Sequence, residues 1–293
     1  MNPSSLPSFF VVGPPRTGTS WLHHRMKVNV SLPVTMKETR FFDRNFARGV
    51  EWYRAQFDPT SPHKTAGEIA PTYFYETEAR ERIAELIPQA KIVCSFRDPV
   101  ERLYSFYKFK LAFAYFRGSF EEFLRDAEVM ESARYAFHLR EWHRIFGRSN
   151  VMVLLYQDLK ADPQDYIRRI CSFIGVSTPV LTAQELGSIH GTEKMTKPRS
   201  YVLTKSALGA LRWMRIHGIV RAVPESLRKN PKLRRFLLGG GLDFPPLNPK
   251  TARELRRASE NEVSELEALI GQDLSLWKDP RRELVSGETM LAH

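Results

Sequence analysis

The segment 13–20, with the sequence GPPRTGTS, combines residue types that bind anions. Its spacing from Gly13 to Gly18 matches the nucleoside-triphosphate loop G-x-x-x-x-G-K-[ST], but Thr19 stands at the position of the lysine. Because that lysine serves the β- and γ-phosphates, its absence favours a phosphate ligand without a triphosphate tail. A plain turn between a strand and a helix is the alternative. The residues that we assign to phosphate binding are Pro15, Arg16, Thr17, Gly18, Thr19, Ser20 and Trp21.

A second polar group, RDPVERLYS at 97–105, follows about 80 residues later. Arg97 is expected at the end of a buried strand, and Pro99 at the first position of a helix, where proline is tolerated. Ser105 lies two turns along that helix, on a face that can converge with Arg97 on a second phosphate. We interpret Arg102 as a solvated charge.

Alternating strands and helices are expected to position both groups. Short apolar runs predict strands at 8–12, 91–96 and 151–156, with a weaker one at 65–69. This alternation predicts an α/β fold with a P-loop-type parallel sheet flanked by helices. Ligands of such sheets bind at the carboxyl ends of the strands, where Gly13 and Arg97 fall. Helices are predicted at 20–28, 77–86, 99–112, 120–127, 133–146, 162–175, 201–220 and 259–270.

The chain is expected to form a single domain over 1–293, with a core at about 8–200 and 251–277. Residues 176–250 are rich in proline, glycine and basic residues, and loop residues dominate 231–249. We therefore predict an irregular basic insertion at about 201–250.

Length and composition indicate the class of protein to which the chain belongs. The chain has 293 residues, of which 42% are hydrophobic and 26% charged, as in globular proteins with a buried core. No apolar run approaches the ~20 residues of a membrane span, and the first residues do not resemble a signal peptide, so a cytoplasmic protein is expected. The two cysteines, Cys94 and Cys171, are expected in the core, and no metal site is predicted.

The formal charge of +11 favours polyanionic partners: nucleic acid, anionic lipid, or a phosphorylated nucleotide with an acidic substrate. Most of the excess lies at 194–235. A basic solvated face is the alternative.

Six segments together resemble the sulfotransferase superfamily that uses 3′-phosphoadenosine-5′-phosphosulfate. The pairing of KE-x-x-FFD with P-x-YF is most similar to the heparan-sulfate branch and its bacterial relatives. The segments are PPRTGTSWL, RDPVERLYSFY, KETRFFD at 37–43, EIAPTYF at 68–74, LLYQDLKADP at 154–163 and SELEALIGQDLSLW at 264–277.

The resemblance implies transfer of a sulfuryl group from this donor to an acceptor, without a metal ion. It assigns the loop to the 5′-phosphosulfate and Arg97 with Ser105 to the 3′-phosphate. The family usually has lysine at the position of Arg16, so the role of this arginine at the bridging oxygen is open. A basic loop of the family implies Lys197 and Arg199 as further ligands of the 3′-phosphate, with a solvated loop as the alternative.

The resemblance also implies a catalytic base. Glu38 falls where the heparan-sulfate branch carries its catalytic glutamate, and Lys37 beside it is expected to hold the substrate or tune the carboxylate. A salt bridge of Glu38 with Arg40 or Lys37 is the alternative. That branch usually has histidine at the position of Arg40, so no histidine role is carried over.

Two other functions compete with this one. A P-loop kinase-like protein that lacks the lysine would bind ATP with Mg²⁺, and a basic nucleic-acid-binding protein would leave both motifs unexplained. The acceptor stays open between a glycan, a lipid and a small-molecule natural product. Peripheral contact with a membrane and the oligomeric state are open too.

Overall fold

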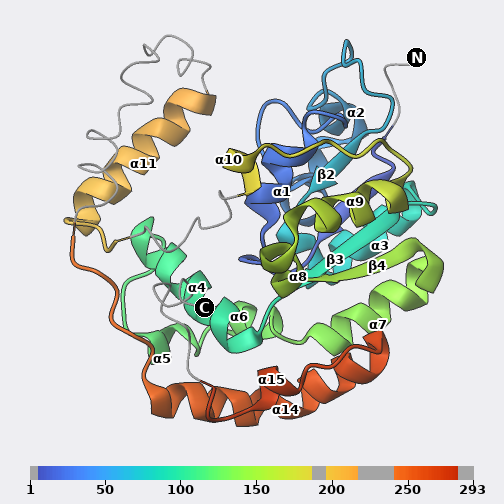
Figure 1. Cartoon of the computed structure of the whole chain (residues 1–293). Coiled ribbons are helices and arrows are strands. Elements are labelled where there is room, and N and C mark those ends of the chain that lie inside the picture. Colours follow the sequence, from blue (N-terminus) through green and yellow to red (C-terminus); the bar gives the residue numbers. More distant parts are fainter. Residues whose placement is uncertain (1–5, 187–195, 217–240, 283–293) are drawn as a thin grey trace.

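A four-stranded parallel sheet forms the centre of the computed structural model, which describes residues 6–186, 196–216 and 241–282 (Figure 1). The strand order is β2-β1-β3-β4. All four predicted strands are present, and the α/β fold with a parallel sheet is confirmed. The strands are β1 (Phe9–Val12), β2 (Gly67–Ile69), β3 (Lys91–Phe96) and β4 (Val151–Leu155).

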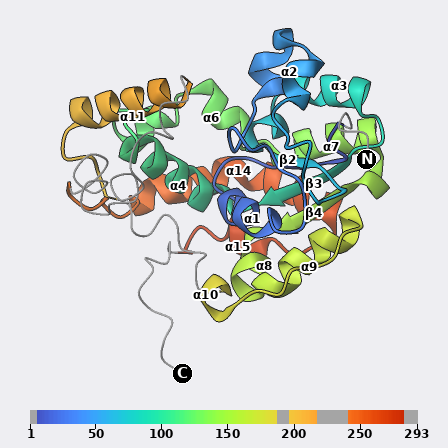
Figure 2. The same cartoon turned by 90° about the horizontal axis from the view of Figure 1, so that it is seen from above.

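Helices cover both faces of the sheet, with α8 and α9 on one side of the strands and α3 and α7 on the other (Figure 2). Alternate residues of β1 pack against the helices on opposite faces of the sheet. Phe9 and Val11 pack against α1, α8 and α9, whereas Phe10 and Val12 pack in the core of α3, α7 and α14. Burial on both faces explains why β1 is apolar throughout. The layers consist of α1 (Thr19–Met26), α8 (Tyr156–Ala161) and α9 (Pro163–Ile174), and of α3 (Thr77–Leu86), α7 (Tyr135–Phe146) and α14 (Pro249–Ile270).

A third helical group forms around α4 (Pro99–Ala112), which begins just beyond the carboxyl end of β3. Asp98 caps α4 by accepting the backbone N–H groups of Val100 and Glu101 at 2.9 and 3.1 Å. The apolar side of α4 packs on α5 (Phe120–Phe123) and α6 (Ala127–Glu131). The other described helices are α2 (Val50–Arg54), α10 (Ala183–Leu186), α11 (Tyr201–Ile216) and α15 (Ser275–Lys278), with short helical turns at Phe41–Asn45, Phe46–Arg48, Pro71–Phe74 and Arg148–Asn150.

Several predicted boundaries are wrong, and local capping explains most of them. The helix predicted at 120–127 is two helices, because Asp126 caps a new one by accepting the N–H of Glu128. The last long helix begins at Pro249, ten residues earlier than predicted, with Asn248 as its cap. The strand predicted to reach Tyr156 ends at Leu155, where α8 begins.

The predicted basic insertion is only partly described. Its first residues form α11, which lies apart from the sheet beyond α4 (Figure 1). Residues 217–240 lie outside the described ranges, so the insertion and the domain boundaries stay predictions. Cys94 and Cys171 are buried and unpaired, as expected. Within the described ranges, no helix is both long and apolar enough to cross a bilayer.

Candidate functional site

The loop between β1 and α1 packs closely on the neighbouring elements through its two glycines. A Cβ at Gly13 would lie 2.6 Å from the carbonyl oxygen of Ser95 on β3, and one at Gly18 would lie 2.6 Å from the Cδ2 atom of Leu159. Both glycines also have positive φ, 128° and 91°, which other residues rarely adopt. Arg16, between them, has φ of 82° and is therefore held in a strained conformation.

Buried hydroxyl groups fix the loop. Ser95 donates its Oγ–H to the carbonyl oxygen of Thr17 at 2.9 Å, and Thr17 donates its own to the carbonyl of Pro14 at 3.1 Å. At Gly18 the helix α1 begins with no side-chain cap, so its first N–H groups and the positive end of its dipole are left for an anion. The loop is thus a rigid turn with the polarity of a phosphate site.

Arg16 reaches from the loop to α4. Its Nε atom donates to Ser105 Oγ at 3.2 Å, and its guanidinium lies 5.0 Å from the ring centroid of Phe109. The pKa of Arg16 is lowered to about 10, chiefly by burial and then by the positive charge of Arg97. Two neighbouring cations at the carboxyl ends of β1 and β3 are an arrangement that a polyanion would stabilise.

Arg97 is oriented by partners on two helices, α4 and α8. Its guanidinium lies 4.7 Å from the ring centroid of Tyr156 in α8 and bonds to Glu101 Oε2 at 3.2 and 3.3 Å. Arg282 shares Glu101, donating to its other oxygen at 3.1 Å. Glu101 thus fixes the direction of Arg97 without fully occupying a guanidinium that has five donors.

A lysine–glutamate pair lies beside the first turn of α1. Lys37 Nζ donates to Glu38 Oε1 at 2.9 Å and lies 3.4 Å from Ser20 Oγ. The Glu38 side chain is 29% exposed, so its carboxylate is open to an incoming molecule. The salt bridge expected as the alternative is present with Lys37, whereas Arg40 binds Asp43 at 2.8 Å instead. Through Ser20, the structure places this pair next to the phosphate loop.

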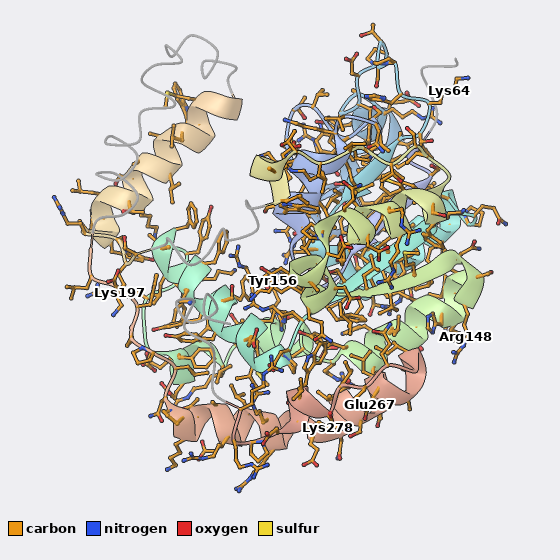
Figure 3. The ribbon with its side chains drawn as sticks, in the orientation of Figure 1. Lys64, Arg148, Tyr156, Lys197, Glu267 and Lys278 are labelled. Carbon is orange, nitrogen blue, oxygen red and sulfur yellow. The ribbon has the colours of Figure 1, made fainter. Side chains whose placement is uncertain are left out.

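Three predicted site residues have no described contact with the group formed by Arg16, Ser105, Arg97, Lys37 and Glu38. Lys197 exchanges backbone hydrogen bonds with Gly241 and Leu242, and its side chain lies near the start of α11, well away from Tyr156 (Figure 3). Arg199 is exposed. The Trp21 indole is buried under α10, where it donates to the carbonyl of Glu185 at 3.4 Å. Their roles in nucleotide binding stay predictions.

The interpretation of Arg102 is wrong. Its side chain is fully buried, donating to the hydroxyl of Tyr135 at 2.7 Å and to Ser132 Oγ at 3.0 Å. The aromatic residues beside the motifs are buried as well and pack in the hydrophobic core. They are Phe41, Phe42, Tyr73, Phe74, Tyr104 and Tyr107.

Sequence reasoning missed Tyr156 and Phe109, which flank the two arginines. Tyr156 is the last residue of the strand predicted at 151–156, so the rule that selected Arg97 at a strand's carboxyl end would have selected it too. Phe109 lies one turn beyond Ser105 on the same helix face. Helical spacing alone does not separate such a residue from an ordinary core aromatic.

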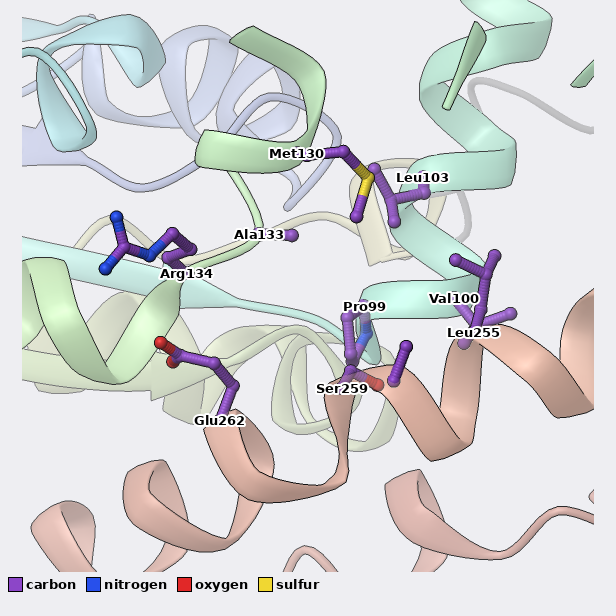
Figure 4. A pocket seen from close by; sticks show the side chains of 10 residues that line it. Pro99, Val100, Leu103, Met130, Ala133, Arg134, Leu255, Ser259 and Glu262 are labelled. Atoms are coloured by element: carbon purple, nitrogen blue, oxygen red, sulfur yellow. The ribbon is translucent and has the colours of Figure 1, made fainter. Parts of the chain in front are cut away.

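A cavity of about 120 Å³ lies elsewhere, between α4, α6 and α14 (Figure 4). Its lining is mostly apolar, with Glu262 and Arg134 on one side. None of the residues assigned to the phosphate loop lines it. In the described part of the chain, no three His, Cys, Asp or Glu side chains gather as metal ligands would.

Comparison with known proteins shows which family this chain resembles. The family model of the sulfotransferase domain matches residues 6–205. The chain is 32% identical over 197 residues to the bifunctional heparan sulfate N-deacetylase/N-sulfotransferase 4 of Mus musculus, covering 59% of this chain and 22% of that protein. It is 29% identical over 181 residues to the heparan sulfate glucosamine 3-O-sulfotransferase 3B1 of Mus musculus, covering 58% of this chain and 46% of that one.

Only part of each relative is therefore matched: about a fifth of the first and half of the second. Among solved structures, a sulfotransferase from Alicyclobacillus acidocaldarius aligns with a TM-score of 0.63 at 23% identity. That alignment covers 94% of this chain and all of the other, and it supports the same fold.

Proposed function

The chain belongs to the sulfotransferase family, and we propose that it moves a sulfuryl group from 3′-phosphoadenosine-5′-phosphosulfate to an acceptor hydroxyl. The observation that carries this proposal is the convergence of Arg16 and Arg97, two partly buried cations beside a rigid, uncapped phosphate loop. A donor with a 5′-phosphosulfate and a separate 3′-phosphate supplies two anionic groups for such a site.

In this proposal the loop and Arg16 bind the 5′ end of the donor. First-turn N–H groups of α1 and the guanidinium of Arg16 neutralise the charge that develops on the leaving phosphate. Arg97 and Ser105 hold the 3′-phosphate. The cations already present supply this positive charge, so we retain the prediction that no metal ion is required.

Glu38 acts as the general base. The acceptor oxygen attacks the sulfur in line, the bond from sulfur to the 5′-phosphate oxygen breaks, and the acceptor proton passes to the Glu38 carboxylate. Lys37 holds that carboxylate in place through their 2.9 Å contact and lies near Ser20 at the loop. The partly exposed position of Glu38 lets an acceptor reach it from solvent.

The acceptor is proposed as a class only. The names of the relatives favour a glycan, whereas a lipid or a small-molecule natural product fits the site chemistry equally well. The basic segment 194–235, with twelve Lys and Arg against one acidic residue, favours an acceptor that carries negative charge. A screen of acceptor classes with radiolabelled donor distinguishes them.

Binding and turnover test the proposal separately. Adenosine 3′,5′-bisphosphate should bind in the presence of EDTA, whereas binding of ATP only with Mg²⁺ would favour the kinase-like alternative. Glu38→Gln should lower turnover by about 100-fold or more while the bisphosphate still binds. Glu76→Gln is the matched control, because Glu76 is 32% exposed and also faces an arginine, Arg44, outside the site. A near-normal rate for Glu38→Gln would show that another group is the base.

A further inference from the structure

Glu68, on the edge strand β2, is a completely buried carboxylate that the proposed reaction does not use. Four donors converge on it. The backbone N–H and the hydroxyl of Thr39 both lie 2.7 Å from Oε1, and the hydroxyls of Tyr53 and Tyr73 lie 2.8 and 3.3 Å from Oε2. Its oxygens therefore tie the segment around Thr39 to the sheet.

Thr39 is the residue directly after Glu38. Its carbonyl oxygen accepts the Nδ2–H of Asn45 at 2.8 Å, and its hydroxyl oxygen accepts the backbone N–H of Phe41 at 3.1 Å. The next residue, Arg40, has φ of 52°, a left-handed conformation that needs support from its surroundings. Glu68 supplies that support at the point where the turn meets the sheet.

We propose that Glu68 is a positioning residue, which fixes the Thr39 turn on β2 and thereby sets the place of the Glu38 carboxylate beside the phosphate loop. This inference rests on the proposed function, since it takes Glu38 as the base. It adds a residue that touches neither donor nor acceptor and acts through Thr39.

If packing alone determined this position, a buried carboxylate would be less favourable than an apolar side chain. Burial raises the pKa of Glu68 to about 7, even though its four hydrogen bonds favour the charged form. An apolar side chain of similar size would fill the same space without that penalty. It would leave the N–H and the hydroxyl of Thr39 without acceptors, and the turn would no longer be fixed.

Glu68→Gln tests the inference, because glutamine keeps the size but offers one acceptor oxygen instead of two. We expect kcat to fall by about 10- to 100-fold, the effect of a misplaced reacting group, with the Kd of adenosine 3′,5′-bisphosphate unchanged. Glu262→Gln is the matched control. Glu262 is also a carboxylate bound by a backbone N–H, that of Ala136 at 2.9 Å, but it is partly buried and lies at the α14 cavity. It should change stability alone.

A double-mutant cycle separates positioning from general stability. In the Glu38→Gln background, Glu68→Gln should cause no further loss of rate, because there is no base left to position. An equal loss in both backgrounds would overturn the inference, and so would a normal kcat for Glu68→Gln. If Glu68→Gln does not fold, Thr39→Val replaces it: this variant loses the hydroxyl bond but keeps the backbone N–H, and a normal kcat would again overturn the inference.

The two proposals fail in different ways. A normal rate for Glu38→Gln, with bisphosphate binding intact, would refute the assignment of the base whatever Glu68→Gln does. A strong effect of Glu38→Gln with none from Glu68→Gln would refute only the positioning role.

Discussion

Replacing Arg16 by methionine should have a small effect on the free protein and a large effect on its complex with the bisphosphate. Methionine keeps most of the aliphatic stem of arginine without the charged guanidinium. Both residues are strained by the positive φ of 82°, so the backbone contribution cancels in the comparison. The change therefore isolates the charge that the proposed site needs.

In the free protein, burial makes this charge costly. A guanidinium whose pKa falls to about 10 through burial and the charge of Arg97 costs about 3.4 kcal/mol, at 1.36 kcal/mol per pH unit. Its contacts offset much of this cost: among them, the bond to Ser105 contributes about 1.5–3 kcal/mol as a hydrogen bond from a charged group, and the contact with Phe109 about 0.5–1 kcal/mol. Arg16→Met should therefore change the free energy of unfolding by only about 1 kcal/mol.

In the complex the same change should remove a charged hydrogen bond to phosphate. Such a bond contributes about 1.5–3 kcal/mol, which corresponds to a 10- to 150-fold weaker Kd for adenosine 3′,5′-bisphosphate. Urea denaturation with and without the bisphosphate measures the first effect, and titration calorimetry in EDTA measures the second.

Arg80→Met is the matched control. Arg80 is a buried arginine on α3, stacked 5.7 Å from the Trp142 ring centroid, and burial lowers its pKa as well. Its replacement should not change bisphosphate affinity. The reasoning is refuted if Arg16→Met destabilises the free protein while leaving the bisphosphate Kd unchanged, because Arg16 would then be a structural residue.

Three further predictions use the same measurements. Gly13→Ala should lower the free energy of unfolding by about 1–3 kcal/mol, because its Cβ would meet the Ser95 backbone at 2.6 Å; wild-type stability would contradict the tight loop. Arg97→Ala should weaken bisphosphate binding 10- to 150-fold, and unchanged affinity would remove Arg97 from the site. Glu68 holds its proton up to a pKa of about 7 when folded but loses it near 4.5 when unfolded, so the stability it contributes falls across this pH window. The difference in free energy of unfolding between wild type and Glu68→Gln, measured by urea denaturation, should fall by up to about 3 kcal/mol from pH 4.5 to 7.5. Parallel curves for the two proteins would contradict the raised pKa.

The sheet was predictable from the sequence because its strands are short apolar runs that end in polar loops. β1 and β3 are buried on both faces, so no alternation obscures them. The start of α4 was predictable too, since Pro99 suits a first helical position. The capping roles of Asp126 and Asn248 are equally local, but aspartate and asparagine are as common in loops as at helix starts.

The proximity of the two groups that we propose bind phosphate was predictable, because strand ends in a parallel sheet lie at one edge. This rule alone brings Gly13 and Arg97 together across 84 positions. The burial of Arg102 was not predictable from the sequence. Its partners Tyr135 and Ser132 come from segments whose packing on α4 no local pattern reveals. Charge favours solvent by default, and only tertiary contacts override that preference.

The two halves of the proposed site are therefore held by different means, and this difference explains which half the sequence predicts. The proposed donor half depends on backbone geometry: glycines, a strand end and a helix start within one short segment. The proposed acceptor half depends on a tertiary hydrogen bond, since Glu68 bonds to Thr39, next to Glu38, from a strand almost 30 residues away. Substitutions on that turn can reshape the surroundings of the base without disturbing the phosphate loop. A fold that holds its two substrates by separate means can change its acceptor while it keeps its donor.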